Sequence, residues 1–248
     1  MELEDILLLL RGEAGMKKWA VDVEKQLQDL TGNPISYVGE GSQWVAYRAY
    51  PPDRERYIIK VNKNQDESRV DNSIENYHAV KRSGMKTLSF ARKSSLLRYA
   101  YECEDLNPEG ENVIYISPNT VRYYAKEKHI LDPILKNVSE FKIKDYEKNI
   151  DELLKHVQIA GVGKNGSGVT EDAIFIGVIL NEDLTISLTY KIADFDTICP
   201  PDEECNDFSG LNRKSMLTTL LEFFAFCVDA DEYKADIDNR WEKEKKEC

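Results

Sequence analysis

The chain has 248 residues, of which 42% are hydrophobic and 31% are charged, values that are ordinary for a folded globular protein. Its formal net charge of −12 argues against a protein that holds nucleic acid through its overall field. No apolar run reaches the roughly 20 residues that a membrane-spanning helix needs, so no membrane partner is expected. The five cysteines are irregularly spaced, which indicates neither a zinc site nor a disulfide framework, and reduced thiols in a cytoplasmic protein are the default interpretation.

The first half of the sequence is rich in predicted strands. Apolar residues at helical spacing predict one or two helices over 3–30, which the turn TGNP ends. Apolar and aromatic residues near period two predict three strands within 35–62. A helical pattern follows over 66–83 and stops at Gly84, and two further strands are expected within 86–105.

The second half is mainly helical. A helix is predicted over 145–160, where apolar residues fall along one face, and an apolar core helix is predicted over 213–228. Between them, the glycine-rich segment 161–168 is expected to be a flexible loop, and a β-hairpin turns at Asn181–Asp183. The charged tail 238–248 is expected to be solvated or frayed. This segregation of strands and helices favours an α+β chain with two lobes.

Two glycines and a lysine in the first half suggest a phosphate site. Gly39 and Gly41 lie between two predicted strands, and Lys60 ends the third strand. Glycines let a backbone approach a phosphate closely, and a neighbouring lysine binds phosphate oxygens as a point charge. The alternative is a hairpin with a glycine bulge and one surface lysine.

Carboxylates at two positions fit the same chemistry. Asp194 comes at the end of the second hairpin strand, where a carboxylate that projects from a strand end can bind Mg²⁺ together with substrate phosphates. An ordinary acidic turn after the strand is the alternative. Glu75 lies on the predicted helix after Lys60 and can partner a buried lysine. By itself, a glutamate on a polar helix is usually solvated.

In this order, the glycine loop, strand lysine, helix glutamate, hairpin and DFD sequence resemble the protein kinase-like fold, over roughly residues 35–228. The resemblance implies that Gly39 and Gly41 cover ATP phosphates. It also implies that Lys60 binds the α- and β-phosphates and that Glu75 holds Lys60.

The resemblance extends to the hinge and includes one departure in the glycine loop. The segment YECEDL at 101–106, with Glu102 and Glu104, falls where the family contacts adenine through backbone groups. Trp44 stands where the family has its third glycine. Glu67 is a weaker match for the helix glutamate.

At the metal and catalytic positions, this sequence has the family's residue type in only some cases. The DFD sequence matches the family's DFG, which implies that Asp194 is a magnesium ligand, and Asp196, in place of the glycine, is a further candidate ligand. If EDAIFI takes the place of the family's asparagine segment, the resemblance implies that Asp172 stands at the metal-binding asparagine and Ser167 at the catalytic aspartate. Two interpretations stay open: a rebuilt loop in which Asp172 takes catalytic or metal duty, or a pseudokinase.

The expected organisation is an N-terminal helical extension at 1–32, an antiparallel-sheet N-lobe at 33–107 and a reduced helical C-lobe at 108–248. The expected activity is phosphoryl transfer from ATP with Mg²⁺, with Lys60 and Asp172 as catalytic residues and an unknown protein or small-molecule acceptor. No nucleic-acid partner is expected. The alternatives are a pseudokinase that serves as a nucleotide-binding or scaffold module, and an α+β interaction protein whose motif series is coincidental.

Overall fold

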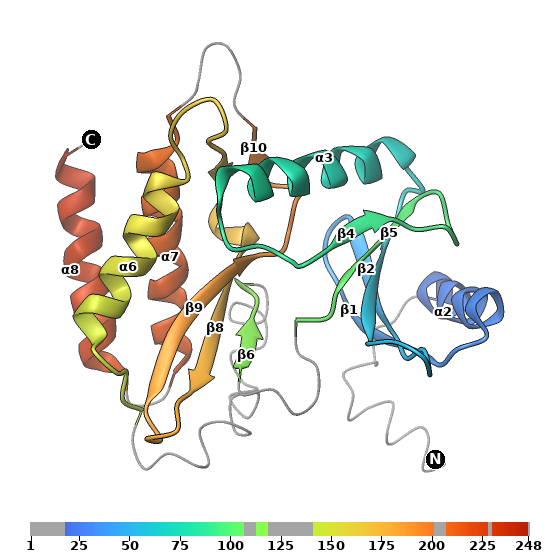
Figure 1. The fold of residues 1–248 in the computed structure, drawn as a ribbon, viewed down its shortest axis with the longest axis horizontal. Helices are drawn as coiled ribbons and strands as arrows, with labels where there is room; N and C mark the ends of the chain where they lie inside the picture. The colour runs from blue at the N-terminus through green and yellow to red at the C-terminus, as the bar shows by residue number, and fades with distance from the viewer. Residues whose placement is uncertain (1–17, 107–112, 119–140, 201–206, 228–229, 248) are drawn as a thin grey trace. The chain divides into compact units, whose positions relative to one another are not determined.

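The computed structural model describes most of the chain (Figure 1). The described residues are 18–106, 113–118, 141–200, 207–227 and 230–247. The chain divides into two compact units, Met1–Val70 with Arg92–Asp105 and Asp71–Ala91 with Leu106–Cys248. Within the described stretches, no helix is long and apolar enough to span a membrane. Any predicted helix before residue 18 lies outside the described residues.

The first unit is built on a five-stranded sheet with the order β1-β2-β3-β5-β4. Its strands are β1 (Ile35–Glu40), β2 (Trp44–Ala49), β3 (Tyr57–Asn62), β4 (Ala91–Lys93) and β5 (Ala100–Glu104). The pairs from β1 through β5 are antiparallel. All five strands expected from the period-two pattern are therefore present.

One face of this sheet forms the core of the first unit. Tyr47 and Val45 on β2, with Ile59 and Val61 opposite them on β3, are fully buried. Burying each such side chain contributes about 1.5–3 kcal/mol. Helix α2 (Lys18–Thr31) is tied to this face because the Tyr47 hydroxyl donates to the carbonyl oxygen of Ala20 at 2.8 Å. Strand alternation sends Lys60 to the other face.

The second unit combines helices with two small sheets. One sheet has the order β6-β8-β9, and β7 pairs with β10 in the other. The elements are α3 (Glu67–Ser83), β6 (Val113–Ile116), α6 (Tyr146–Ile159), β7 (Gly168–Val169), η2 (Glu171–Ala173), β8 (Ile174–Leu180), β9 (Ile186–Ile192), β10 (Ile198–Cys199), α7 (Ser209–Phe226) and α8 (Asp231–Glu247). Helix α3 ends before Gly84, whose φ of +83° suits glycine, as the sequence predicts. The predicted hairpin is β8–β9, although its loop is longer than expected, because Leu180 and Ile186 form the last pair.

Helices α6 and α7 supply much of the core of the second unit. The face of α6 predicted to be apolar is buried, with Ile150, Leu153, Leu154 and Val157 in the interior. Helix α7 buries residues on most of its sides, among them Met216, Leu217, Leu220, Phe223 and Phe224. The prediction of a core helix here is confirmed.

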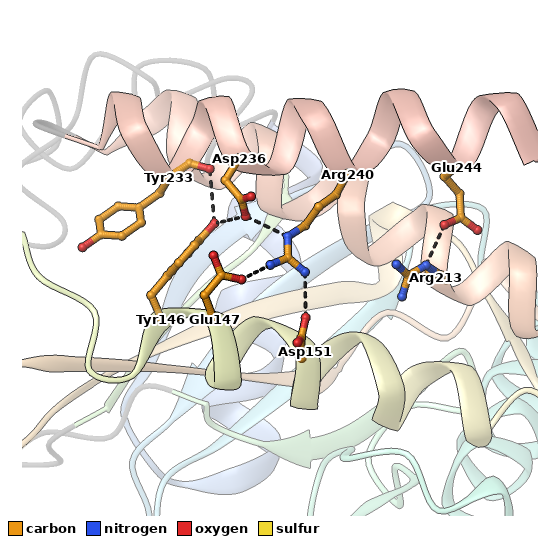
Figure 2. A network of polar contacts seen from close by, with 8 residues as sticks. All are labelled: Tyr146, Glu147, Asp151, Arg213, Tyr233, Asp236, Arg240 and Glu244. Atoms are coloured by element: carbon orange, nitrogen blue, oxygen red, sulfur yellow. Dashed lines mark hydrogen bonds and ion pairs between the residues drawn. The ribbon is translucent and has the colours of Figure 1, made fainter.

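The C-terminal tail is a helix end with exposed residues, as expected, but it also packs against its neighbours. Helix α8 packs along α7 and buries Ile237 completely. Figure 2 shows the polar contacts that fix it: the Arg240 guanidinium binds Asp236 and Asp151, each at 2.7 Å, and also Glu147. Arg213 on α7 binds Glu244 at 2.6 Å. Arg240 and Glu244 of the tail thus pair with α6 and α7, while Glu242, Lys243 and Lys245 are exposed.

The glycine-rich segment 161–168 is packed at both ends, with Lys164 and Asn165 exposed between them, and its flexibility stays a prediction. The Ser167 N–H donates to the carbonyl oxygen of Ala160 at 3.2 Å. A Cβ added to Gly166 would lie 2.5 Å from the carbonyl oxygen of Gly161. Glycine is needed there because two backbone segments pack directly on each other.

Candidate functional site

A row of four residues crosses the sheet of the first unit on the face occupied by Lys60. Lys60 lies opposite Ala46 on β2 and Tyr101 on β5, and Ala46 lies opposite Gly39 on β1. Directly opposed residues of antiparallel strands project to the same face. The half-buried Lys60 side chain thus has the small Ala46 on one side and Tyr101 on the other, and Gly39 lies one strand beyond Ala46. Its Nζ atom lies 5.8 Å from the centroid of the Tyr101 ring, within cation–π range.

The loop between β1 and β2 is fastened to the end of β3. The Lys63 ammonium donates to the carbonyl oxygen of Gly41 at 2.6 Å and pairs with Glu40 at 2.9 Å. Trp44, which stands where the family has its third glycine, begins β2 and packs edge-on against Tyr101 with centroids 5.2 Å apart. The indole therefore replaces the glycine as a packing residue.

The space around the two predicted loop glycines fits a phosphate cradle. A Cβ added to Gly39 or Gly41 would meet no atom within 4 Å, and neither residue has a left-handed φ. Neither packing nor backbone conformation of the protein requires glycine there. The open space leaves the backbone of both glycines accessible to a ligand, which the predicted phosphate site requires.

The predicted hinge residues have their side chains on the opposite face from Lys60. Glu102 lies opposite Ile59, and Glu104 lies opposite Tyr57. The buried Glu102 carboxylate accepts from the Arg92 guanidinium at 2.8 Å, an ion pair within the first unit. Adenine contact through the backbone of this segment stays a prediction.

The β8–β9 hairpin brings two predicted metal-binding aspartates to the same end. Ile174 and Ile192 form the last pair of the ladder, and the N–H of Ala193 donates to the carbonyl oxygen of Ala173 at 3.0 Å. Asp172 and Asp194 are the next residues outward on each strand. Both are partly buried, and the Oδ1 atom of Asp194 is shielded from solvent.

Helix α3 fastens the DFD segment from one side. The side-chain amide of Asn76 donates to the carbonyl oxygen of Phe195 at 2.7 Å, and the Ser73 hydroxyl donates to Oδ1 of Asp196 at 3.0 Å. The fully buried Phe195 ring packs edge-on against Tyr77 with centroids 5.5 Å apart. The carboxylate that replaces the family's glycine is thus bound by α3, and its metal role stays a prediction.

Glu75 lies on the exposed side of α3. The opposite side of this helix buries Val70, Ser73, Tyr77 and Val80. The weaker candidate Glu67 is also exposed, at the start of the helix. The expected pairing of Glu75 with Lys60 joins the two units and stays a prediction.

Asn212 on α7 fixes the backbone next to the candidate site, and the sequence motifs did not predict this role. Its amide donates to the carbonyl oxygens of Val157 at 3.0 Å and Ser167 at 2.9 Å, and its side-chain oxygen accepts from the N–H of Val169 at 2.8 Å. Asn212 is fully buried, so these bonds fix the segment before β7 against α7. A lone asparagine near the start of an apolar helix was the available signal.

The position of Ser167 changes the interpretation of the catalytic loop. Ser167 is 0% exposed and precedes β7, so its side chain faces the packed interior. The segment that joins β7 to the hairpin is only Thr170–Ala173, which holds both Glu171 and Asp172. Glu171 was not a candidate from the sequence. Any carboxylate acting from this connection is one of these two.

Buried hydroxyls lie on both strands next to this connection. Ile198 pairs with Val169, so Thr197 and Thr170 follow as opposed neighbours just outside the β7–β10 ladder. Their Oγ1 atoms and the Oγ of Ser167 are buried and have no hydrogen-bond partner in the described structure. Such groups cost about 1–3 kcal/mol when they stay unsatisfied.

The donor set fits Mg²⁺ only together with a phosphate ligand. Among the described residues, no group of three or more His, Cys, Asp or Glu side chains is placed to hold a metal ion. Mg²⁺ is usually bound through one or two carboxylates, with substrate phosphates and waters completing the octahedron. Asp172 and Asp194 supply two carboxylates at one hairpin end, which matches that requirement.

Comparison with known proteins gives similarities of structure. No family model and no curated protein matches the sequence. The chain is similar to the Rio2 kinase of Chaetomium thermophilum, in a complex with ADP, Mg²⁺ and phosphoaspartate, at 11% identity and TM-score 0.43, over 87% of this chain and 64% of that one. It is also similar to macrolide 2'-phosphotransferase MphH of Brachybacterium faecium at 9% identity and TM-score 0.34, over 90% and 82%. A third similar structure is ADP-bound aminoglycoside phosphotransferase APH(2'')-Ib, at 12% identity and TM-score 0.33, over 87% of this chain and 85% of that one.

The chain thus spans 64% of the length of the Rio2 kinase. Its own elements follow the order expected of a kinase-like chain: glycine loop, strand lysine, helix, then a hairpin that ends in DFD. The α+β class and the order of helices and strands that the sequence predicts are confirmed.

Proposed function

We propose that the chain is a kinase-like phosphotransferase that binds ATP with Mg²⁺ and has a divergent catalytic loop. The observation that carries the proposal is the row on one face of the sheet in which Ala46 lies between Lys60 on β3 and Gly39 on β1. A cation next to side-chain-free backbone suits a polyphosphate. The open space at Gly39 and Gly41 supports the same ligand.

The candidate residues of the first unit, together with Glu75 of the second, bind the nucleotide. Lys60 binds and orients the phosphates, while the loop with Gly39 and Gly41 covers them. Glu75 of α3 holds the Lys60 ammonium. The backbone of 101–106, which includes Glu102 and Glu104, contacts adenine.

In the second unit, Asp194 and Asp172 hold Mg²⁺, with Asp196 as a further candidate. Bound Mg²⁺ supplies neutralisation of the phosphate charge, and phosphoryl transfer depends chiefly on such charge neutralisation and positioning. Asp172 also lies in the short connection before β8, where a base can accept the proton of an acceptor hydroxyl. The acceptor class is left open.

A pseudokinase is the second candidate, and the hydrogen bond of Ser73 to Asp196 favours it. Because Ser73 of α3 binds the Asp196 carboxylate, which stands where the family has a glycine, this segment can serve a structural role without binding metal. The interior position of Ser167 adds to this interpretation. In that case, the chain binds nucleotide or a protein partner without phosphoryl transfer.

A thermal-shift titration with Mg·ADP tests the binding step. A ligand that binds only the native state, at a concentration 100 times its dissociation constant, stabilises the folded protein by about 2.7 kcal/mol. The wild-type melting temperature is therefore expected to rise. Lys60→Met should lose most of the rise, while Lys25→Met on α2 should retain it. Equal shifts in both variants would overturn the role of Lys60.

Release of ADP from ATP then separates the two candidates. An active phosphotransferase turns over slowly with water as acceptor, and Asp172→Asn should bind nucleotide yet release no ADP. A wild-type chain that binds Mg·ADP but never releases ADP from ATP supports the pseudokinase.

A further inference from the structure

A groove lies within the second unit, between α6, the end of β9 and the residue Lys86 after α3. Its volume is about 380 Å³, which is within the range of small-molecule sites. It is lined by Lys86, Asn149, Glu152, Leu153, Lys155, His156, Ile159, Leu188 and Tyr190. None of these residues has a role in the proposed nucleotide site.

The polar floor of the groove is a Tyr190–His156 pair. The Tyr190 hydroxyl is buried and lies 2.5 Å from Nδ1 of His156. Burial raises the pKa of Tyr190, and the backbone N–H of Lys86 hydrogen-bonds to its oxygen. Tyr190 therefore keeps its proton, and its hydroxyl shares one hydrogen bond with Nδ1 of His156, so Nε2 is the ring nitrogen that can face a ligand.

The charges on the lining favour an anion. Lys86 and Lys155 are both exposed, and Lys86 uses one of its three donors on the Thr189 hydroxyl at 2.9 Å. The one lining carboxylate, Glu152, is 66% exposed and lies 3.9 Å from Lys148, outside the lining. The Asn149 amide is held in place by β9, since it donates to the carbonyl oxygen of Leu188 and accepts from its N–H. Unused donors therefore outnumber unused acceptors.

The rest of the lining is apolar. Leu153 and Leu188 are buried, and Ile159 is a large apolar side chain that is 63% exposed at the last position of α6. An exposed isoleucine beside lysines offers contact to an apolar body next to a charged head. Inorganic anions do not use such a surface.

We propose that this groove binds a small organic anion, an aryl or short alkyl carboxylate or sulfonate. The anionic head lies between Lys86, Lys155 and Nε2 of His156, and the apolar body lies against Leu153 and Ile159. The proposal is independent of nucleotide binding by the rest of the chain.

Calorimetric titration with 8-anilinonaphthalene-1-sulfonate tests this site. Saturable binding of one equivalent is expected, and the double variant Lys86→Gln, Lys155→Gln should weaken it at least 10-fold. Lys243→Gln, an exposed lysine on α8, should change it less than 2-fold. Near-UV circular dichroism of each variant excludes probe binding by a loosened core.

Two further probes test the two halves of the ligand. Ile159→Ser should weaken binding of the anilinonaphthalene sulfonate probe but leave the weak binding of benzoate, which depends on the lysines. Neutral benzyl alcohol should bind wild type far less tightly than benzoate. Non-saturable binding, binding unchanged in the double lysine variant, or equal affinity for benzyl alcohol and benzoate would overturn the proposal.

Discussion

Asn76 on α3 holds the backbone of the DFD segment: its side-chain amide donates to the carbonyl oxygen of Phe195 at 2.7 Å. The neighbouring Ser73 and Tyr77 on the same helix contact Asp196 and the Phe195 ring. Residues three and four apart on a helix share a face, so one face of α3 engages both Phe195 and Asp196. The placement of Asp194 beside them depends on this contact.

Asn76→Ala is expected to destabilise the protein by about 1 kcal/mol, the usual worth of one such hydrogen bond. Chemical denaturation of the variant measures the change in free energy of unfolding. Asn72→Ala, an exposed asparagine on the same helix, is the control and should be neutral or slightly stabilising, because alanine favours helix. Equal effects of the two substitutions would show that Asn76 does no more than occupy a helical position.

Asn212→Ala should cost about 3 kcal/mol or more, because it removes a buried side chain that makes three hydrogen bonds and leaves three backbone groups unsatisfied. Denaturant titration gives the free energy of unfolding. Asn239→Ala, on the exposed side of α8, serves as the matched control and should change it by less than about 0.5 kcal/mol. A loss below 1 kcal/mol at Asn212 contradicts its role in fixing the segment before β7.

Two glycine substitutions should behave in opposite ways. Gly166→Ala places a Cβ 2.5 Å from the carbonyl oxygen of Gly161, so it should destabilise by about 1–3 kcal/mol or prevent folding. Gly41→Ala meets no protein atom within 4 Å and should melt near the wild-type temperature. Its expected defect is weaker Mg·ADP binding. Normal nucleotide affinity in a folded Gly41→Ala protein would remove the case for a phosphate cradle.

His156 should make stability depend on pH. Burial first and the Lys86 charge second lower the pKa of the folded His156 below its ordinary value of 6.5. Between these two pKa values the unfolded chain binds more protons, so stability falls as pH decreases from 6.5 toward the folded pKa. The advantage of wild type over His156→Gln should therefore be larger at pH 7.5 than at pH 5.5. Urea titrations at both pH values measure it, and an advantage that does not change with pH would refute the neutral, buried imidazole.

Local sequence patterns predicted the elements well and their packing less well. The strands around Lys60 and the hairpin before Asp194 follow from period-two alternation, and Gly84 marks the end of α3 as expected. The packing of α8 and of the segment around Gly166 depends on contacts between distant residues. A charged or glycine-rich composition does not encode such contacts, so both were predicted to be loose.

The candidate site shows the same division. Spacing along the chain places Asp172 and Asp194 at hairpin ends, which the register bears out, but it cannot show that Ser167 is buried or that Asp196 binds Ser73. Glu171 and Asn212 were missed because neither belongs to a motif. Their importance follows from the short β7–β8 connection and from burial.

Calorimetric titration of ADP in the presence of Mg²⁺ and in EDTA tests the central proposal most directly. Wild type is expected to bind ADP at least 10-fold more tightly with Mg²⁺. Asp194→Asn should fold normally yet lose this difference, while Asp183→Asn, on the exposed hairpin loop, should keep it. No binding of ADP by wild type, or an equal Mg²⁺ effect in Asp194→Asn, would contradict the proposed nucleotide site.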